Sequence, residues 1–327
     1  PVWFDHLFRF KSHDFALANI EREVFYITGA CMYIKEDVIK KVGLFDSNLV
    51  MGFEDVDYCI RARSKGFKII YNPSSVLTHY ESVTRGRDIK PSTIKSLKYF
   101  WRKWNNYLNK RKVTKNNKLN IIYVLQDTGV GGGHRDVFEH INRLKKLGHH
   151  IQLFALAGQP KWFKLDIKVR KFINYSILEK ALQKIDAIKI ACWWESAETV
   201  WRASLSKGIP VYFVQDIESS YYQDNQQEAT KVLASYRKEF NYLTISNWNK
   251  NQLRKLDINS ILISPGIDLN TFLPDKKNAR RKNVILAIGR RHPLKNLQLT
   301  INAWIKIKDQ TELWMFGIDP SIYQGIW

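Results

Sequence analysis

Three acidic side chains that lie close together are of the type that moves protons or binds metal ions. Glu54, Asp55 and Asp57 follow an apolar loop and begin a stretch with helical spacing. The amino end of a helix favours negative charge, so carboxylates are stable at this position. A carboxylate there can accept a proton from a hydroxyl group or bind a hard cation. A simple helix cap has the same composition, so the residues alone leave both interpretations open.

A glycine cluster at 129–133 is a second candidate site. It lies between an apolar run at 120–125 and a helical stretch at 134–147. Glycine there allows the backbone to approach a phosphate, and the helix supplies N–H donors. The dinucleotide fingerprint G-x-G-x-x-G fails because position 134 is His134, and no acidic residue ends the next strand, expected at 151–157. The cluster therefore disfavours NAD, and by itself it is a weak indication of phosphate binding.

Aromatic and polar residues also follow two later strands, expected at 187–192 and 211–214. They are Trp193, Trp194 and Glu195 after the first strand, and Gln215, Asp216 and Glu218 after the second. Ligands of parallel sheets collect at the carboxyl ends of strands, so either set could contact a substrate. Paired tryptophans occur as often in a core, and His134 at the start of its helix could face the same edge.

The secondary structure that must position these residues follows two different patterns along the chain. Before residue 113, apolar runs predict strands at 24–33, 67–71 and 75–79 around helices at 35–42 and 54–65. The pattern before residue 113 predicts a mixed sheet with the helix at 54–65 beside it.

From residue 119, strands and helices alternate. Strands are expected at 120–125, 151–157, 187–192, 211–214, 242–245 and 260–263, with helices at 134–147, 197–206, 226–240 and 249–256. Such alternation predicts a parallel sheet covered on both faces. A charged break at 275–282 precedes a further unit, with a strand from 284, a helix at 297–307 and a strand at 312–316.

A basic amphipathic helix is expected at 91–112. Lysines and arginines fill the positions between the members of its apolar face. That face consists of Ile94, Leu97, Trp101, Trp104 and Leu108. One interpretation is a terminal helix packed on its own domain. The other is a helix on a membrane surface, because indole rings suit the interface and cations suit anionic headgroups.

The composition limits the function classes. The chain has 327 residues, a length that suits two or three domains, and its hydrophobic content of 45% is enough to fill their cores. Its net charge is +21. Such a charge attracts polyanions, but no nucleic-acid-reading motif occurs, so nucleic acid is not an expected partner. No spanning apolar run and no basic, apolar leader occur. Cys31, Cys59 and Cys192 lie far apart, which indicates a reduced, cytoplasmic setting without structural zinc.

Four short motifs follow one another in the first segment. They are T-G-A-C-M at 28–32, G-L-F-D at 43–46, E-D-V-D at 54–57 and V-L-T-H at 76–79. Their order resembles the carboxyl-terminal half of family-2 glycosyltransferases of the GT-A fold, especially the rhamnosyltransferase-like branch. The resemblance implies that Asp55 is the base that deprotonates an acceptor hydroxyl.

The same resemblance implies roles for the neighbouring residues. Glu54 would lie beside the base, Thr28 and Gly29 would line the acceptor pocket, and Asp57 would be structural. His79 would complete a site for a divalent metal, Mg or Mn. The family's D-x-D motif and nucleotide-binding strands would precede the first residue of this chain, so we expect the segment to be inactive alone.

A second series of motifs extends over 119–327. After the glycine cluster come G-H at 148–149, Q-D at 215–216, S-P-G-I-D at 264–268, G-R at 289–290 and K-N at 295–296. This order resembles family-4 glycosyltransferases of the GT-B fold. The resemblance implies that Arg290, or Arg291 in its place, and Lys295 hold the donor diphosphate across a cleft from the glycine loop. No metal is expected there, because two cations and backbone amides can balance a diphosphate.

The remaining roles implied for this second segment concern both substrates. The amides of Gly131, Gly132 and Gly133 would contact the diphosphate, and Trp194 and Glu195 would contact the acceptor. The family's E-x7-E element, which binds the donor sugar, would follow the last residue of this chain.

Together the resemblances imply an α/β protein with four segments. They are a truncated GT-A remnant at 1–112, a linker at 113–118, a Rossmann-like, acceptor-side GT-B domain at 119–278, and the beginning of the donor-side domain at 279–327. We expect a fragment of a bacterial bifunctional glycosyltransferase that moves hexosyl or rhamnosyl groups from nucleotide sugars to a cell-surface polysaccharide or lipid-linked glycan. It would work in the cytoplasm or at the inner face of the membrane, with peripheral contact through 91–112.

Two other functions remain open from the residues. One is a basic nucleic-acid- or membrane-binding protein with degenerate enzyme domains, and the other is a nucleotide-dependent enzyme of different chemistry on a Rossmann fold. The intact acidic pair at 54–55 and the basic residues at 290 and 295 favour sugar transfer, because a binding module needs neither.

Overall fold

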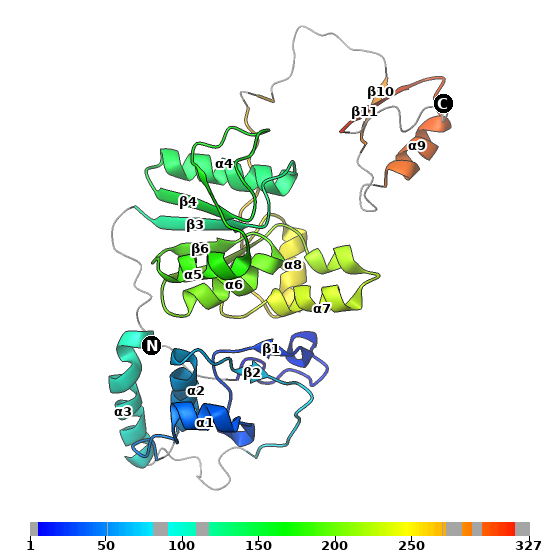
Figure 1. The fold of residues 1–327 in the computed structure, drawn as a ribbon. Coiled ribbons are helices and arrows are strands. Elements are labelled where there is room, and N and C mark those ends of the chain that lie inside the picture. Colours follow the sequence, from blue (N-terminus) through cyan, green and yellow to red (C-terminus); the bar gives the residue numbers. More distant parts are fainter. Residues whose placement is uncertain are drawn as a thin grey trace. The chain divides into compact units, whose positions relative to one another are not determined.

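The chain forms two compact units, Pro1–Pro265 and Gly266–Trp327. The structure, a computed structural model, describes residues 6–50, 52–80, 91–108, 118–269, 271–272, 283–289 and 296–317. Figure 1 labels the helices and strands along the chain. The strands of the three predicted structured segments lie in three separate sheets. The predicted segment boundaries at 112, 119 and 279 stay predictions.

A seven-stranded sheet forms the centre of the first unit, in the order β5-β4-β3-β6-β7-β8-β9. Its strands are β3 Asn120–Leu125, β4 His150–Ala155, β5 Val169–Lys171, β6 Ile188–Ala191, β7 Ile209–Val214, β8 Asn241–Thr244 and β9 Ser260–Leu262. All six neighbouring pairs are parallel. The strand order reverses between β3 and β6, and the crevice at such a reversal is where parallel sheets bind ligands.

Helices cover both faces of this sheet (Figure 1). They are α4 Gly132–Lys146, α5 Tyr175–Gln183, α6 Trp194–Ser204, α7 Gln226–Ser235 and α8 Asn247–Lys255. Helix α4 contributes Phe138 to one hydrophobic core, while α5 and α6 contribute Leu178 and Trp201 to another. Two cores on two faces explain why the central strands are almost continuously apolar. The predicted parallel sheet covered on both faces is confirmed, and the fold class is α/β.

The first segment contains much less sheet than predicted. Its strands β1 Arg22–Glu23 and β2 Ile70–Tyr71 form a short antiparallel pair, in place of the mixed sheet. Residues Gly29–Cys31 form a 3-10 turn (η2) inside the strand predicted at 24–33, because Thr28 Oγ1 accepts a hydrogen bond from the Ala30 amide. Residues 75–79 form no strand. The helices are α1 Glu36–Val42 and α2 Glu54–Ser64, close to the predicted bounds.

Residues at the start of the first segment are packed into the core of the seven-stranded sheet domain. Leu17, in the 3-10 helix η1 Ala16–Asn19, and Ile20 are buried in the same cluster as Trp201 and Tyr236. Strand β1 follows directly, so its two residues lie at the junction with the sheet domain. This packing explains why residues 1–265 form one compact unit rather than two.

The aromatic face of α3 Pro91–Leu108 packs on its own segment. Phe100 is fully buried, and Trp101, Trp104 and Tyr107 pack around the same small core. The packed terminal helix, the first of the two interpretations, therefore describes residues 91–108. Residues 109–112 lie outside the described part. Within the described residues, no helix has the length and apolar character needed to cross a membrane.

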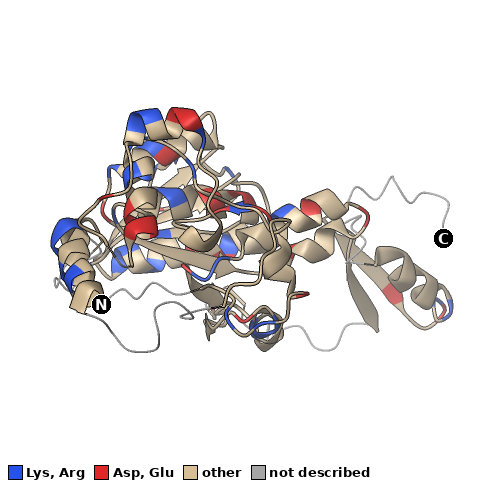
Figure 2. Cartoon of the chain, turned by 90° about the horizontal axis from the view of Figure 1, so that it is seen from below, with Lys and Arg blue, Asp and Glu red and all other residues tan. Residues whose placement is uncertain are grey.

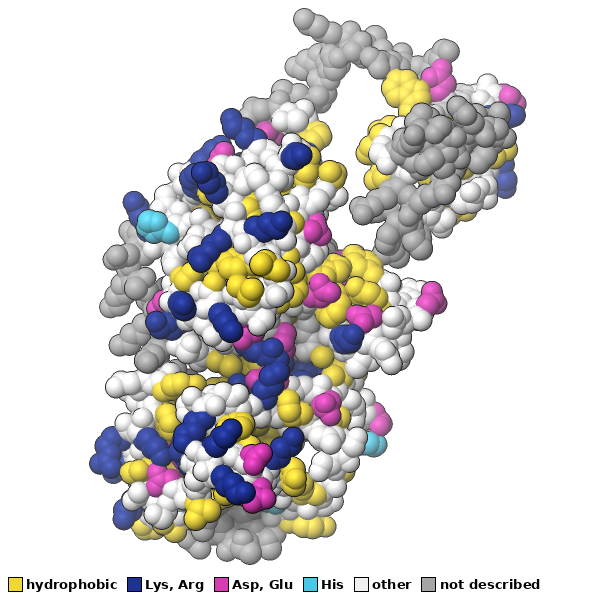
Figure 3. All heavy atoms as spheres, in the orientation of Figure 1, with side chains coloured by type: hydrophobic (Ala, Val, Ile, Leu, Met, Phe, Trp, Pro, Cys, Tyr) yellow, Lys and Arg dark blue, Asp and Glu magenta, His cyan; other side chains and the backbone are white. Residues whose placement is uncertain are grey.

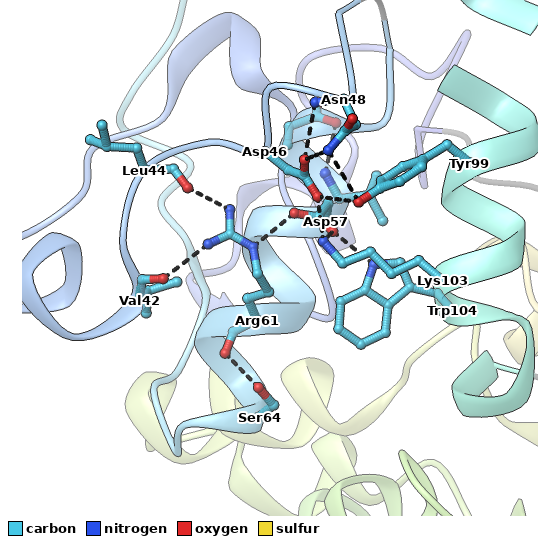
Figure 4. A network of polar contacts seen from close by, with 12 residues as sticks. Val42, Leu44, Asp46, Asn48, Asp57, Arg61, Ser64, Tyr99, Lys103 and Trp104 are labelled. Carbon is cyan, nitrogen blue, oxygen red and sulfur yellow. Dashed lines mark hydrogen bonds and ion pairs between the residues drawn. The ribbon is translucent and has the colours of Figure 1, made fainter. Parts of the chain in front are cut away.

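A buried carboxylate joins α3 to α2 (Figure 4). Asp57 is fully buried; it accepts hydrogen bonds from Arg61 Nε at 2.8 Å and Trp104 Nε1 at 2.8 Å, and pairs with Lys103 Nζ at 2.7 Å. Lys103 also bonds Asp46 Oδ2 at 2.7 Å, and this bond holds the pKa of Asp46 well below its usual range. Asp57, the last acid of E-D-V-D, and Asp46, the acid of G-L-F-D, therefore hold helices together. For Asp57 this agrees with the structural role expected of it.

The second unit is a strand–helix–strand arrangement, as predicted. Strands β10 Val284–Ile288 and β11 Glu312–Phe316 are parallel neighbours, and α9 Leu297–Ile305 lies between them in sequence. Ala287, Leu297 and Ile301 form its small core.

Asp57, buried in α2, and Glu36, exposed in α1, allow a matched test of the packing between α2 and α3. We expect Asp57→Ala to lower stability by about 3–5 kcal/mol, because it removes a fully buried carboxylate and leaves Arg61 Nε and Trp104 Nε1 without their acceptor. Glu36→Ala breaks an exposed i,i+4 pair with Lys40 and should cost at most about 1 kcal/mol. Urea unfolding followed by circular dichroism measures both midpoints. Equal shifts in the two variants would contradict the role given to Asp57.

Candidate functional site

Asp55 is held in place by the backbone of the 28–31 turn. It is the second residue of α2, and its Oδ2 accepts a hydrogen bond from the Gly29 amide at 2.8 Å. Its Oδ1 accepts from the Val56 amide at 2.7 Å. A Cβ atom on Gly29 would lie 3.5 Å from the Asp55 Cβ, so the turn packs directly on this side chain. The two amide donors therefore fix the direction of both carboxylate oxygens.

Three of the five site residues that the family-2 resemblance implied line one hollow, whereas Gly29 and Glu54 do not line it. A cavity of about 2250 Å³ is lined by Thr28, Asp55 and His79 among other residues, and His79 is exposed. One carboxylate oxygen of Glu54, Oε2, is buried without a hydrogen-bond partner beside Asp55. Asp57 is buried in the network with α3 and does not line the hollow.

The described residues give limited support for a metal at this hollow. They contain no group of three or more His, Cys, Asp or Glu side chains that could hold an ion. His79 and Asp55 line one cavity, but they do not form an all-protein cage. Mg²⁺ commonly binds through one or two carboxylates together with substrate phosphates, so such a cage is not required.

The glycine loop folds back on its own polar side chains. Gly129 N donates to Asp127 Oδ1 at 2.7 Å, and His134 Nδ1 lies 2.8 Å from Gly129 O. Helix α4 then begins at Gly132, so the amides of its first turn open at the carboxyl edge of the sheet. A Cβ atom on Gly133 would lie 2.4 Å from Gln215 Oε1, so the loop after β7 closely approaches this turn.

An aromatic pair lies at the same edge. Trp193, directly before α6, stacks on Tyr221 with ring centroids 6.2 Å apart. The Tyr221 hydroxyl donates to Asp216 Oδ2 at 2.6 Å. Trp193 follows β6, while Asp216 and Tyr221 follow β7, so neighbouring strands bring them together.

Trp194 and Glu195 lie differently from one another. The Trp194 ring packs partly on the core, and its Nε1 donates to the Tyr222 hydroxyl at 3.2 Å. Glu195 is exposed. Of the two adjacent tryptophans, Trp193 therefore contributes its ring to the pair at the edge, and Trp194 has contacts that suit packing.

Glu218 is a buried acid behind this edge. Only 2% of its surface is exposed, and its Oε2 accepts from the Trp194 amide and the Tyr212 hydroxyl, each at 3.0 Å. Burial raises the pKa of Glu218 to about 8. The side chain is therefore protonated at neutral pH, and it joins the start of α6 to the loop after β7.

The donor-side residues cannot be placed in this way. Arg290, Arg291 and Lys295 lie outside the described residues. Among the described residues, lysine and arginine positions are spread over several helices rather than gathered on one element (Figure 2).

Two residues at the sheet edge were missed from the sequence. Tyr221 lies in the 3-10 turn η3 Glu218–Tyr222, and the only signal for it was an aromatic pair after the acidic stretch. Asp127 follows β3, and its position directly after a strand was a signal of the kind used for Asp216.

Comparison with known proteins confirms the resemblance of the first segment. Residues 6–99 match the family model described as glycosyltransferase like family 2. An uncharacterized protein, y4gI, of Sinorhizobium fredii is 32% identical over 83 residues, which are 24% of this chain and 9% of that protein. The N-acetylglucosaminyl-diphospho-decaprenol L-rhamnosyltransferase of Mycobacterium tuberculosis is 34% identical over 68 residues, which are 21% of this chain and 22% of that protein. The chain thus spans less than a quarter of either relative.

Solved structures resemble a larger part of the chain at low scores. WaaG, a glycosyltransferase involved in lipopolysaccharide biosynthesis, has a TM-score of 0.42 and 16% identity over 63% of this chain and 66% of its own. A glycosyltransferase from Rickettsia africae has a TM-score of 0.40 and 17% identity over 64% of this chain and 72% of its own. Scores this low do not establish a shared fold.

The protonated state of Glu218 gives the protein a specific pH dependence. The folded state keeps this proton up to about pH 8, whereas the unfolded chain releases it near pH 4.5. Stability from this group is therefore complete below pH 4.5 and is lost as the pH rises through 8. We expect Glu218→Gln to flatten the decrease in the urea midpoint between pH 5 and 8, and Glu36→Gln to leave it unchanged. A decrease of the same size in Glu218→Gln would contradict the assignment.

Proposed function

We propose that the protein takes part in sugar transfer from nucleotide-sugar donors to a glycan acceptor, with Asp55 as the base of the first site. The observation that carries this proposal is the Asp55 carboxylate, held by the Gly29 amide where it lines a large hollow. The match of residues 6–99 to a glycosyltransferase family model supports it.

The chemistry requires a base because a sugar hydroxyl is a poor nucleophile. As the acceptor oxygen bonds to the anomeric carbon of the donor, its proton passes to Asp55, and the bond from that carbon to the diphosphate breaks. The Gly29 amide fixes the direction of Oδ2, so the base has one orientation before substrate arrives. Glu54, whose Oε2 is buried, would lie beside the base without contacting the acceptor.

In this proposal a divalent metal would bind together with the nucleotide-sugar donor. His79 would contact an Mg or Mn ion whose other ligands are the donor phosphates, and the ion would balance the charge of the leaving diphosphate. His79 lines the same hollow as Asp55, which suits that arrangement.

For the second site we propose a transferase of GT-B type at the carboxyl edge of the seven-stranded sheet. The open amides at the start of α4 suit a phosphate oxygen, while Asp127 and Asp216 suit sugar hydroxyls. Trp193, Glu195 and Tyr221 would contact the acceptor there. Arg290 and Lys295 would bind the donor diphosphate, and no metal would be needed.

We further propose a lipid-linked or polysaccharide acceptor and work at the inner face of the membrane. One relative of the first segment is named as an N-acetylglucosaminyl-diphospho-decaprenol L-rhamnosyltransferase, which supports such an acceptor. The donor of the first site would then be a rhamnosyl or hexosyl nucleotide.

Asp55→Asn tests the first site. In the full-length protein, we expect the rate of sugar transfer at the first site to fall by about 10²–10⁴-fold. A positioned base contributes a factor of this size to the rate. Circular dichroism should show an unchanged fold, since asparagine can keep the bond from Gly29. Asp37→Asn, an exposed acid in α1, is the control and should keep full activity. Full turnover in Asp55→Asn would refute the role of this base.

Lys295→Ala tests the second site. We expect it to weaken binding of a nucleotide-sugar donor by about 1.5–3 kcal/mol in calorimetry, the value of one charge-assisted contact. Addition of a chelator should leave this binding unchanged. Lys306→Ala, in the same unit, is the control. Affinity that is lost to chelator but kept in Lys295→Ala would overturn the metal-free arrangement.

A further inference from the structure

Phe53, the residue directly before the acidic pair at 54–55, has a left-handed backbone conformation. Its φ is 70° and its ψ is 1°. A bulky side chain rarely adopts positive φ, whereas glycine does so freely and asparagine does so more readily than most residues. Gly52 before it also has a positive φ, of 88°. Two consecutive residues with positive φ therefore precede helix α2, and the second of them is strained.

Helix capping does not explain this conformation. A residue at the start of a helix is commonly extended, and its side chain accepts a hydrogen bond from a backbone amide. Phenylalanine has no side-chain acceptor, and Phe53 contributes its backbone oxygen, which accepts from Asp57 N at 2.9 Å. A glycine or asparagine at this position would adopt the same backbone conformation at a lower cost. The phenylalanine ring therefore contributes something that those residues lack.

The ring of Phe53 stacks on Phe100 of helix α3. The ring centroids are 4.9 Å apart and the ring planes are 28° from parallel. Phe100 is fully buried, and Phe53 is half-buried against the small core that contains Val56 and Ile60 of α2. Basic side chains lie on the exposed face of α3 (Figure 3), so its aromatic face is the one turned toward this core. Helix α3 thus supplies the surface that holds Phe53 in a strained conformation.

The strained turn leads directly to the proposed base. Asp55 is two residues further along the chain, and its Oδ2 accepts from the Gly29 amide at 2.8 Å. Because the dihedral angles of Phe53 set the direction in which α2 begins, a change in them would move the Asp55 carboxylate relative to that amide. Gly52, Phe53 and Asp55 all line the same hollow. Backbone strain is typical of functional sites, where the surrounding structure holds a residue that would otherwise relax.

We propose that Phe53 is a positioning residue for Asp55, and that its ring, stacked on Phe100, holds the turn before α2 in the left-handed conformation. This role rests on the proposed function, in which Asp55 is the base of the first site. The competing role is simple packing, in which the ring only fills space beside α3. The two roles rank substitutions in opposite orders, because positioning favours a residue that tolerates positive φ, whereas packing favours an apolar residue.

Phe53→Asn and Phe53→Leu separate the two roles. Asparagine tolerates the left-handed conformation without a ring, whereas leucine keeps apolar volume but neither stacks nor favours positive φ. The readout is the exchange rate of the Gly29 amide proton, measured by NMR, because Asp55 binds that amide. We expect this rate to rise by about tenfold in Phe53→Leu and to change little in Phe53→Asn.

Phe45→Leu is the matched control. It removes a ring contact to Tyr58 of α2, with centroids 4.8 Å apart, and leaves the turn before α2 unchanged. The Gly29 amide should therefore exchange at the wild-type rate in this variant. An exchange rate in Phe53→Leu that is no faster than the rate in Phe53→Asn would overturn the proposal.

Kinetics of the full-length protein complete the test. A misplaced base slows the chemical step, so kcat at the first site should fall by about 10²-fold in Phe53→Leu and much less in Phe53→Asn, with little change in the KM of the donor. Because Phe53 is only half-buried, we expect both variants to fold, which urea unfolding checks. Full turnover in Asp55→Asn would refute the base itself. Loss of turnover in Asp55→Asn together with a wild-type kcat in Phe53→Leu would refute only the positioning role.

Discussion

Glu23 carries a buried carboxylate that two arginines from distant parts of the chain share. Arg63 comes from α2 and Arg202 from α6, while the backbone oxygen of Glu23 accepts from Arg237 at 2.7 Å. Arg63 and Arg237 also lie over the ring of Trp201. Buried ion pairs add little net stability, but removal of one partner leaves charges that cannot be solvated. The interaction therefore selects one arrangement of the segment on the sheet domain.

The position of the proposed base depends on that arrangement. Asp55 is near the amino end of α2, whereas Arg63 fastens the carboxyl end of the same helix to Glu23. Asp57, in the first turn, fastens the helix to α3 through Trp104. These two contacts, near opposite ends of one short helix, leave it little freedom to rotate. The carboxylate in the hollow is consequently held by elements that themselves take no part in chemistry.

The sheet domain could be predicted from sequence far better than the first segment. Strand β3 and strand β11 have the predicted bounds, because continuous apolar runs between turn residues mark buried parallel strands. Strand β5 was missed because it is only three residues long and mostly polar, and helix α5 was missed because it is a short element of nine residues. The strand predicted at 24–33 fails because the Gly29 amide bonds the Asp55 side chain, and a strand neighbour would need that amide.

The candidate sites also contain residues that the sequence could predict and contacts that it could not. Motif order was enough to place Thr28, Asp55 and His79 around one hollow. It could not show that Tyr221 stacks on Trp193, because that contact depends on the distance between two strand ends. Nor could it show the pairing of Glu23 with Arg202, residues 179 positions apart, since periodicity carries no information about partners at that range.

The packing of residues 17–23 on the sheet domain has a consequence for biosynthesis. Arg22 bonds Tyr236 and Glu23 bonds Arg237, contacts that span 214 positions of the chain. At about 5–20 residues per second, a ribosome needs about 10–40 seconds to make the partners of this segment. Leu17 and Ile20 remain exposed to chaperones during that delay. Residues 17–23 therefore reach their final packing only after the sheet domain has been made, and a chain cut near residue 112 would lack the surface on which they pack.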